Sequence, residues 1–139
     1  MKPEITIDED GTKRYYLNGK PHREDGPAVE WDDGSKEWYL NGELHRVGGP
    51  AVDRSNGDKE WYINGERHRV DGPAIEWYDG SNEWFLYGKR HRVNGPAAEY
   101  ADGNKSWWIN GEDVTEEINT WIKEYPLPEN EALFKLTWA

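Results

Sequence analysis

Apolar and polar side chains alternate along short segments of this chain, and the alternation restarts at regular intervals. In residues 36–40, Lys-Glu-Trp-Tyr-Leu, the side chains of Trp38 and Leu40 fall on one face of an extended strand and Tyr39 falls on the other. Period-two alternation in a short segment rich in aromatic side chains is typical of a β-strand. Comparable segments fill most of residues 1–112, so the pattern predicts a β protein.

Short turn sequences separate these segments. Asn41-Gly42 follows the strand directly and is a strong signal for a two-residue type I′ hairpin, because both central positions need a positive φ. The same dipeptide recurs at Asn18-Gly19, Asn64-Gly65 and Asn110-Gly111. Tyr87-Gly88 departs from it, and we expect that turn to be less stable. After the second arm, Asp25-Gly26-Pro27 turns the chain into a strand over 28–31, since proline lacks an N–H and suits the start of a strand.

The alternation belongs to a strict 23-residue repeat, in which positions one period apart form columns of similar side chains. The aromatic columns are Tyr15, Trp38, Trp61, Trp84, Trp107 and Tyr16, Tyr39, Tyr62, Phe85, Trp108. A His-Arg pair recurs at 22–23, 45–46, 68–69 and 91–92, and Gly-Pro-Ala recurs at 26–28, 49–51, 72–74 and 95–97. One such unit cannot bury its own aromatic face, so we expect neighbouring units to stack and share their stability along the array.

These signals predict a mainly β fold, a single-layer antiparallel meander of tandem β-hairpin repeats, over residues 1–112. From Asp113 the period changes, and residues 113–139 are predicted to form a C-terminal cap. Asp113 and Glu116 have the spacing of a capping box at a helix start. Five apolar residues then share one helical face: Val114, Ile118, Trp121, Ile122 and Tyr125. Pro126 ends the predicted helix, and a short strand is expected over 134–138. A helix that docks a partner is the alternative interpretation of this segment.

Composition narrows the function classes. The chain has 139 residues, nine Trp and eight Tyr but only 35% apolar residues, so aromatic side chains must supply much of the buried area. Its formal net charge of −11 argues against binding to nucleic acid or to an anionic membrane, because both need clustered Lys and Arg. The absence of Cys, of a secretory h-region and of a long apolar segment leads us to expect a cytoplasmic location, in the host cell if the protein is viral.

One unit carries a specific resemblance. The run 61–74, Trp-Tyr-Ile-Asn-Gly-Glu-Arg-His-Arg-Val-Asp-Gly-Pro-Ala, resembles a MORN-type repeat, and the likeness extends over about residues 5–111. The variant with His-Arg-x-Asp-Gly-Pro-Ala is similar to repeats of phage and giant-virus proteins and of proteins labelled as antitoxins. The resemblance implies a β-hairpin solenoid that acts as a scaffold or binding surface and not as a catalyst.

The four His residues lie one per unit, at His22, His45, His68 and His91, so they form a row and not a cluster. A catalytic or zinc site needs different residues that converge on one point. We therefore expect each ring to pack on an aromatic neighbour or to bond to a turn carbonyl, and we predict no catalytic residue, metal or cofactor.

Binding residues are expected in two sets. The first is the Arg column, Arg23, Arg46, Arg69 and Arg92, which either pairs with the acidic column Glu30, Asp53, Glu76 and Glu99 or forms an Arg–aromatic groove for an anionic nucleotide. The second consists of Tyr39, Tyr62, Trp31 and Trp77, predicted to form an outward aromatic stripe, together with the pattern break at Tyr87.

The leading hypothesis is a non-enzymatic interaction protein, encoded by a phage or similar element, that binds a host or viral protein through its repeat sheet. The alternatives are a sponge for an anionic nucleotide signal, an antitoxin-like inhibitor and a DNA mimic. Direct nucleic-acid or membrane binding is not expected. The open edges of the array also allow a homodimer.

Overall fold

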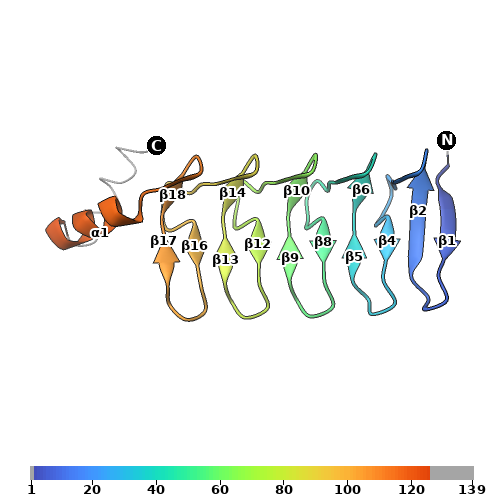
Figure 1. The fold of residues 1–139 in the computed structure, drawn as a ribbon, viewed down its shortest axis with the longest axis horizontal. Coiled ribbons are helices and arrows are strands. Elements are labelled where there is room, and N and C mark those ends of the chain that lie inside the picture. The colour runs from blue at the N-terminus through green and yellow to red at the C-terminus, as the bar shows by residue number, and fades with distance from the viewer. Residues whose placement is uncertain (1, 126–139) are drawn as a thin grey trace.

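The computed structural model describes residues 2–125 and consists of antiparallel hairpins placed side by side in a row (Figure 1). Within the described residues there are 19 strands and one helix, α1 (Thr115–Glu124), at the C-terminal end of the row. The sheet does not close into a barrel. The prediction of a mainly β, antiparallel meander of hairpin repeats with a C-terminal helix is therefore confirmed.

The main sheet runs the whole length of the row, and each of its strands pairs with the strands before and after it on one antiparallel path. In spatial order these strands are β1 (Glu4–Ile7), β2 (Lys13–Leu17), β4 (Val29–Glu30), β5 (Lys36–Glu37), β8 (Val52–Asp53), β9 (Lys59–Glu60), β12 (Ile75–Glu76), β13 (Asn82–Glu83), β16 (Ala98–Glu99) and β17 (Lys105–Ser106). Spatial order follows chain order because consecutive strands of the sheet are joined alternately by a short turn and by a longer excursion that returns to the neighbouring position.

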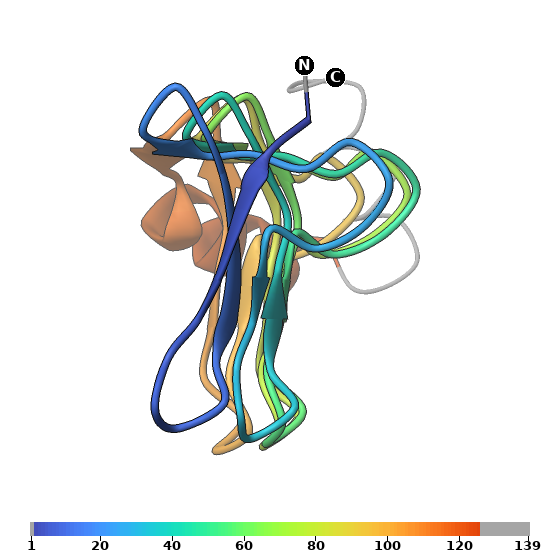
Figure 2. The ribbon, with the colours of Figure 1, turned by 90° about the vertical axis from the view of Figure 1, so that its right-hand side faces the viewer.

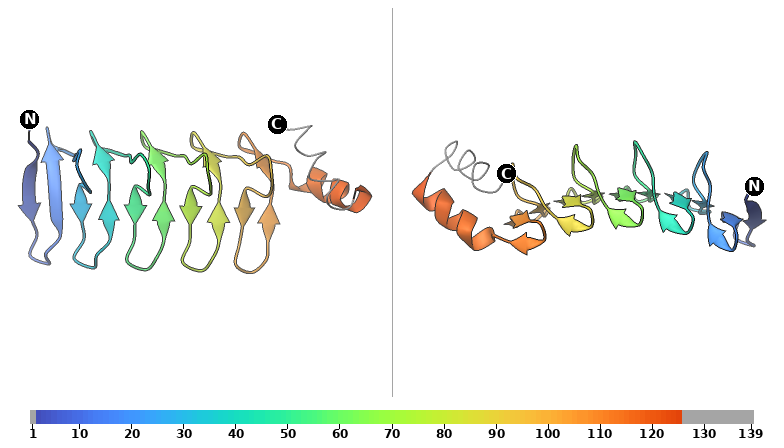
Figure 3. Two further views of the ribbon diagram at one scale, coloured as in Figure 1. Left: turned by 180° about the vertical axis from the view of Figure 1, so that it is seen from behind. Right: turned by 90° about the horizontal axis from the view of Figure 1, so that it is seen from above.

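A second hairpin extends each aromatic strand beyond the main sheet. These hairpins pair β2 with β3 (Lys20–Pro21), β6 (Tyr39–Leu40) with β7 (Glu43–Leu44), β10 (Tyr62–Ile63) with β11 (Glu66–Arg67), β14 (Phe85–Leu86) with β15 (Lys89–Arg90), and β18 (Trp108–Ile109) with β19 (Glu112–Asp113). The strand changes partners at its Trp. The Trp38 amide donates to the Ala51 carbonyl at 2.7 Å, and its carbonyl accepts from the His45 amide at 3.0 Å. Viewed from the end and from above, the hairpins turn to one side of the main sheet and the proline-containing loops to the other (Figures 2 and 3).

Strand register divides the side chains of the main sheet into two rows, because directly paired residues of an antiparallel sheet share a face. One row alternates aliphatic and acidic side chains: Val29, Glu37, Val52, Glu60, Ile75, Glu83, Ala98. We call the surface that carries it the carboxylate face. The other row is almost entirely charged: Lys13, Glu30, Lys36, Asp53, Lys59, Glu76, Asn82, Glu99, Lys105. With one exception, Asn82, opposite charges alternate along it, which stabilises the pairing of the strands.

The core is thin and distributed, as a single layer requires. The alanines of the Gly-Pro-Ala column are fully buried at Ala28, Ala51, Ala74 and Ala97. The residues that follow them, such as Val52 and Ile75, are buried as well. Stacking of neighbouring units was expected to bury the aromatic face, but Trp38, Trp61 and Trp84 are only half-buried, because no second layer covers them.

Neighbouring units are joined by three recurring hydrogen bonds at the hairpins. At the first joint the Arg23 amide donates to the Tyr39 carbonyl at 3.1 Å, and the Gly42 amide donates to the Pro21 carbonyl at 2.9 Å. The Asn41 amide donates to Nδ1 of His22 at 2.9 Å. The His bond recurs at the three later joints, from Asn64 to His45, Tyr87 to His68 and Asn110 to His91. Of the two expectations for the His rings, packing on an aromatic neighbour is met at His68, whose ring centroid lies 4.3 Å from that of Tyr87. The expected bond to a turn carbonyl is replaced by a hydrogen bond that each ring accepts from a turn amide of the next unit.

The C-terminal segment differs in detail from the sequence expectation. The helix begins one residue later than a capping box at Asp113 would place it, with Val114 at the N-cap and no side-chain capping bond. The carboxylate of Asp113 instead accepts from the amide and the hydroxyl of Thr115. Of the predicted apolar face, Val114 and Ile118 are buried, whereas Ile122 and Tyr125 are 40% and 43% exposed. The strand predicted over 134–138 lies outside the described residues.

Within residues 2–125 no helix is long and apolar enough to cross a membrane.

Candidate functional site

The Arg column lies on the face opposite the carboxylate face, and each guanidinium lies over the aromatic ring of its own unit. Arg23 lies 4.1 Å from the ring centroid of Tyr15, Arg46 lies 3.8 Å from that of Trp38, and the distances at Arg69–Trp61 and Arg92–Trp84 are 3.9 and 3.8 Å. Each guanidinium also donates to a proline carbonyl four residues on, at 3.0–3.1 Å. The arginines therefore fasten the proline loops to the aromatic strands.

Acidic neighbours balance most of these charges. Arg23 bonds to Asp25 and approaches Glu30, and Arg69 does the same with Asp71 and Glu76. Burial alone would lower the pKa of the Arg23 guanidinium, but the nearby carboxylates, Asp25 foremost, hold its pKa above the ordinary value. The predicted pairing of the Arg and acidic columns is thus present at these units and at Arg92–Glu99.

The second unit departs from this pairing. Asp53 pairs with Lys59 instead of Arg46, and Gly48 stands where the other units have Asp25, Asp71 and Asn94. Arg46 therefore has no side chain two residues on to match the Asp25, Asp71 and Asn94 bonds of Arg23, Arg69 and Arg92.

Between successive proline loops the surface is hollowed into three equivalent grooves, which we call the loop grooves, and the surface that carries them is the groove face. The first lies between the loops at 23–27 and 45–47, the second between 46–50 and 68–71, and the third between 69–73 and 91–94. The third groove has a volume of about 620 Å³. Their floors contain Trp38 and Leu40, Trp61 and Ile63, and Trp84 and Leu86. At the rims Val47 and Val70 are 81% and 84% exposed.

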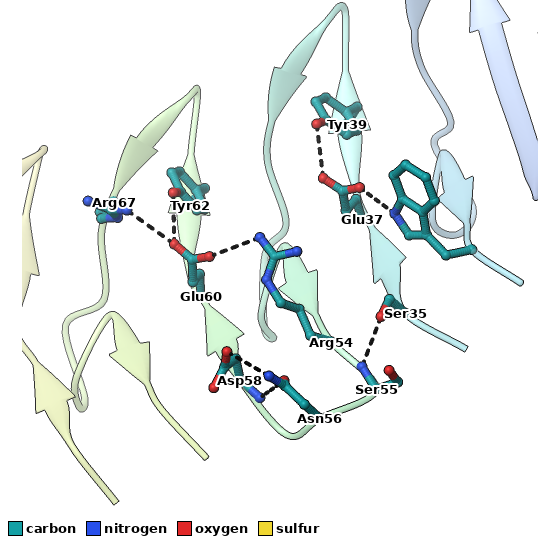
Figure 4. Close-up of polar contacts among 11 residues, drawn as sticks. Ser35, Glu37, Tyr39, Arg54, Ser55, Asn56, Asp58, Glu60, Tyr62 and Arg67 are labelled. Carbon is teal, nitrogen blue, oxygen red and sulfur yellow. Dashed lines mark hydrogen bonds and ion pairs between the residues drawn. The ribbon is translucent and has the colours of Figure 1, made fainter. Parts of the chain in front are cut away.

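The carboxylate face carries most of the predicted aromatic stripe, bonded to acidic side chains (Figure 4). Glu37 accepts hydrogen bonds from the Tyr39 hydroxyl at 3.2 Å and from the Trp31 indole at 2.5 Å. Burial, reinforced by the charge of Glu37, raises the pKa of Tyr39 to about 12. The phenol therefore remains protonated and acts as a donor over the physiological pH range.

The two carboxylates further along the row are more deeply enclosed. The Glu60 side chain is 7% exposed and lies among the Tyr62 hydroxyl at 3.0 Å, Arg67 at 3.3 Å and Arg54 at 3.6 Å (Figure 4). Burial and the charge of Glu60 raise the pKa of Tyr62. Glu83 is equally buried and accepts from the Trp77 indole at 2.9 Å and from Arg90 at 2.7 Å. Each of these carboxylates thus links its strand of the main sheet to the arginine of the hairpin that follows, Glu60 to Arg67 and Glu83 to Arg90.

Tyr87 lies apart from both faces, at the tip of the hairpin formed by β14 and β15. Its φ of 47° matches the 48–52° of the asparagines in the same column, so the turn keeps its shape without the favoured residue. The side chain is 72% exposed, and its ring lies 4.3 Å from that of His68 in the preceding unit.

The structure therefore separates the predicted binding residues. The Arg column lies on the groove face, the set Tyr39, Tyr62, Trp31 and Trp77 lies on the carboxylate face, and Tyr87 lies at a hairpin tip. The proposed stripe is only partly outward, because Phe85 in the same column is buried. The exposed valines at the groove rims and the buried carboxylates were missed by sequence reasoning. Their columns, Glu24-Val47-Val70-Val93 and Arg14-Glu37-Glu60-Glu83-Ser106, could have been read from the repeat.

In residues 2–125, no three His, Cys, Asp or Glu side chains are grouped so that they could hold a metal ion. In comparisons with known proteins, no protein-family model matches this chain and no curated protein is similar to it.

Proposed function

We propose that this chain is a non-enzymatic interaction protein that binds another protein through its repeat sheet. The observation that carries the proposal is the row of equivalent loop grooves with exposed valines at Val47 and Val70. Charged side chains around the grooves are largely paired with one another, whereas these apolar side chains are not covered. Apolar groups exposed at repeated positions beside half-buried aromatics are typical of protein-binding surfaces.

The same geometry gives less support to the alternatives. A nucleotide sponge would need guanidinium groups that can turn toward a ligand, but Arg23 and Arg69 are held by an aromatic ring, a carbonyl and two carboxylates each. A DNA mimic would need carboxylates in an unbroken row, whereas Lys36 and Lys59 alternate with the acids of the charged row. An antitoxin is a protein-binding protein and falls within the proposal.

Two finer parts of the proposal rest on sequence reasoning alone. Origin from a phage or similar element follows from the resemblance of the His-Arg-x-Asp-Gly-Pro-Ala unit to MORN-like repeats of phage and giant-virus proteins. A cytoplasmic site of action follows from the composition, which lacks Cys.

Affinity capture followed by direct binding tests the proposal. The full chain is immobilised and exposed to host-cell extract, and retained proteins are quantified against an unrelated acidic protein of similar net charge. We expect at least one protein to be enriched on this chain and, once purified, to bind it in solution. If every enriched protein binds the acidic control equally well when purified, the proposed function is wrong.

A further inference from the structure

The position that follows the third loop groove differs from the three open grooves, because the chain itself covers it. Val47, Val70 and Val93 occupy the same position in successive loops, yet Val47 and Val70 are more than four-fifths exposed whereas Val93 is half-buried. Val93 packs against a buried cluster that contains Ile109 of β18 and Ile118 of α1. The difference therefore arises where α1 follows the last hairpin.

The helix takes the place of the next loop. Val114, just before α1, stands one period after His91, and its amide donates to the Trp107 carbonyl at 2.8 Å as the His91 amide does to Trp84. From that position α1 extends beyond the last hairpin at the C-terminal end of the row (Figure 3). Ile118, on the first turns of the helix, is 4% exposed and packs with Val114 and Ile109. Trp121, one turn further on, packs against the same cluster.

We propose that the open loop grooves bind an amphipathic helix of a partner protein, in the way that Val93, Trp107 and Ile109, after the third groove, receive α1 of this chain. The inference deepens the proposed function, on which it rests, by naming the surface and the kind of partner. Each groove offers a Trp and a Leu or Ile on its floor and an exposed Val at its rim, Val47 in the first and second grooves and Val70 in the second and third. Such a groove suits one bulky apolar side chain.

The spacing of the grooves sets the spacing of the partner side chains. Successive grooves are two strands apart, which is about 10 Å at a strand separation of about 4.8 Å. Residues seven apart on an α-helix are about 10.5 Å apart along its axis. The partner helix should therefore present bulky apolar side chains at positions i and i+7, with its axis along the row of grooves.

The charge of this chain predicts the charge of the partner helix. At the grooves themselves arginines and acids are paired, as Arg23 is with Asp25 and Arg69 with Asp71, so local charges largely cancel. The charge that a partner meets on approach is therefore the net charge of the whole chain, −11. Complementary charge would speed association and orient the helix. The expected partner is accordingly a basic amphipathic helix and not an acidic one such as α1, which has Glu116 and Glu117 in its first turn.

The test uses the full chain and a synthetic probe. The probe is a fluorescent, helix-forming peptide on a Lys/Gln/Ala background with Ile at position i and Trp at i+7. A control peptide of identical charge has Ala at both positions. The groove variant is Val47→Glu/Val70→Glu, and the matched control variant is Tyr78→Glu/Tyr100→Glu, which adds the same charge at exposed turn residues outside the grooves. Circular dichroism checks that both variants keep the β fold.

We expect the Ile/Trp peptide to bind the native chain at least tenfold more tightly than the Ala peptide. The groove variant should lose at least tenfold in affinity, even though its added acids attract the basic probe more strongly. The control variant should bind within a factor of about two of the native chain. Equal binding of the two peptides, equal loss in both variants or no binding at millimolar peptide would overturn the inference. Concentration-dependent self-association that the groove variant abolishes would overturn it too, because it would assign the grooves to a second copy.

The outcomes separate the inference from the proposed function. Suppose that a purified partner binds the native chain and the groove variant with equal affinity. The proposed function would then stand, but the loop grooves would not be the binding surface. Absence of any partner would remove the proposed function whatever the synthetic peptide does.

Discussion

A single atom in each repeat, Nδ1 of the His column, joins one unit to the next. It accepts the amide of the following hairpin turn, as from Asn41 to His22 and from Asn110 to His91, at 2.9–3.0 Å. Only an unprotonated nitrogen can accept, so the bond fixes the ring proton on Nε2 and excludes the doubly protonated ring. The joints between repeats are therefore compatible only with neutral imidazole at these positions.

We predict that acid weakens the joint at His91. Burial lowers the pKa of this imidazole from its ordinary value of 6.5, so at mildly acidic pH the unfolded chain binds a proton that the folded chain does not. This contribution to stability is complete above pH 6.5 and is lost as the pH falls from there through the lowered pKa. Urea unfolding at pH 7.5 and 5.5 should show a lower midpoint at pH 5.5.

The His91→Gln variant is the control. It cannot be protonated in this range, so its midpoint should change less between the two pH values than that of the native chain. The carboxylates with lowered pKa values, among them Asp33 and Asp79, lose their contribution only below their ordinary value of 3.8 and do not interfere. An equal change in the variant would contradict a role of His91.

A second residue-scale prediction concerns the pattern break at Tyr87. Its φ of 47° lies in the left-handed region, where a residue with a bulky side chain is strained by roughly 1 kcal/mol and Asn is better tolerated. Tyr87→Asn should raise the free energy of unfolding by several tenths to about 1 kcal/mol, less what is lost with the ring contact to His68. Denaturant unfolding measures it, and the reciprocal Asn64→Tyr should destabilise. Stabilisation by both variants would refute the argument.

Sequence reasoning succeeded at this scale where a residue type has one dominant conformational use. The Asn-Gly columns predicted the turns, and the positive φ values at Asn41 and Gly42 confirm the conformation. It gave no indication that acids of the strands, such as Glu60, are buried. The ion pairs of Glu60 are made with Arg54 and Arg67, which lie outside its strand, in a turn and in the hairpin that follows. The alternation of side chains within a strand does not reveal such partners.

At the scale of elements, each aromatic strand after β2 belongs to two sheets in succession. Its first half pairs within the main sheet and its second half within a hairpin, with Trp38 at the change of partner in β5–β6. This explains why most strands have only two residues. Alternation predicted one strand over 36–40, because a local pattern does not reveal a change of partner.

Helix α1 is held by one side chain above all. We predict that Ile118→Ala, which removes atoms from a side chain that is 4% exposed, lowers the free energy of unfolding of the last unit by roughly 2–4 kcal/mol. Ile122, on the same helix and 40% exposed, gives the matched control, and Ile122→Ala should cost less than about 1 kcal/mol. Hydrogen exchange at β17 and β18 measures the effect, and equal changes in the two variants would contradict the packing.

At the scale of the whole molecule, the two ends of the row are unequal. At the N-terminal end β1 has one strand neighbour, and Ile5 and Ile7 are 54% and 69% exposed. At the other end α1 buries Ile109 and Val114. In an array stabilised by contacts between neighbours, an uncovered end opens more readily than a covered one.

This asymmetry predicts a gradient of hydrogen exchange. Amides in β1 and β2 should exchange faster than those in β9 and β12, and those in β18 should be protected nearly as well as the middle. Exchange followed by mass spectrometry on the full chain at neutral pH would show it. Uniform exchange across all units would indicate a single cooperative transition instead.

The periodicity made the overall architecture predictable, because a strict 23-residue repeat leaves one way for units to stack. The groove between loops could not be predicted in the same way. It depends on the direction in which hairpins and proline loops leave the main sheet, and that direction is a property of several units together (Figure 3).

The replacement of His by Val114 has a consequence for how such a chain can grow or shrink. The Val114 side chain has no nitrogen that could accept a hydrogen bond from a further hairpin turn, so the joint used by the earlier repeats cannot form after it. Every joint before it uses the same atoms, so a 23-residue cassette can be duplicated or lost anywhere between His22 and His91 without a new kind of joint. The position of Val114 thus sets the number of repeats, and each repeat that is gained or lost changes the number of loop grooves by one.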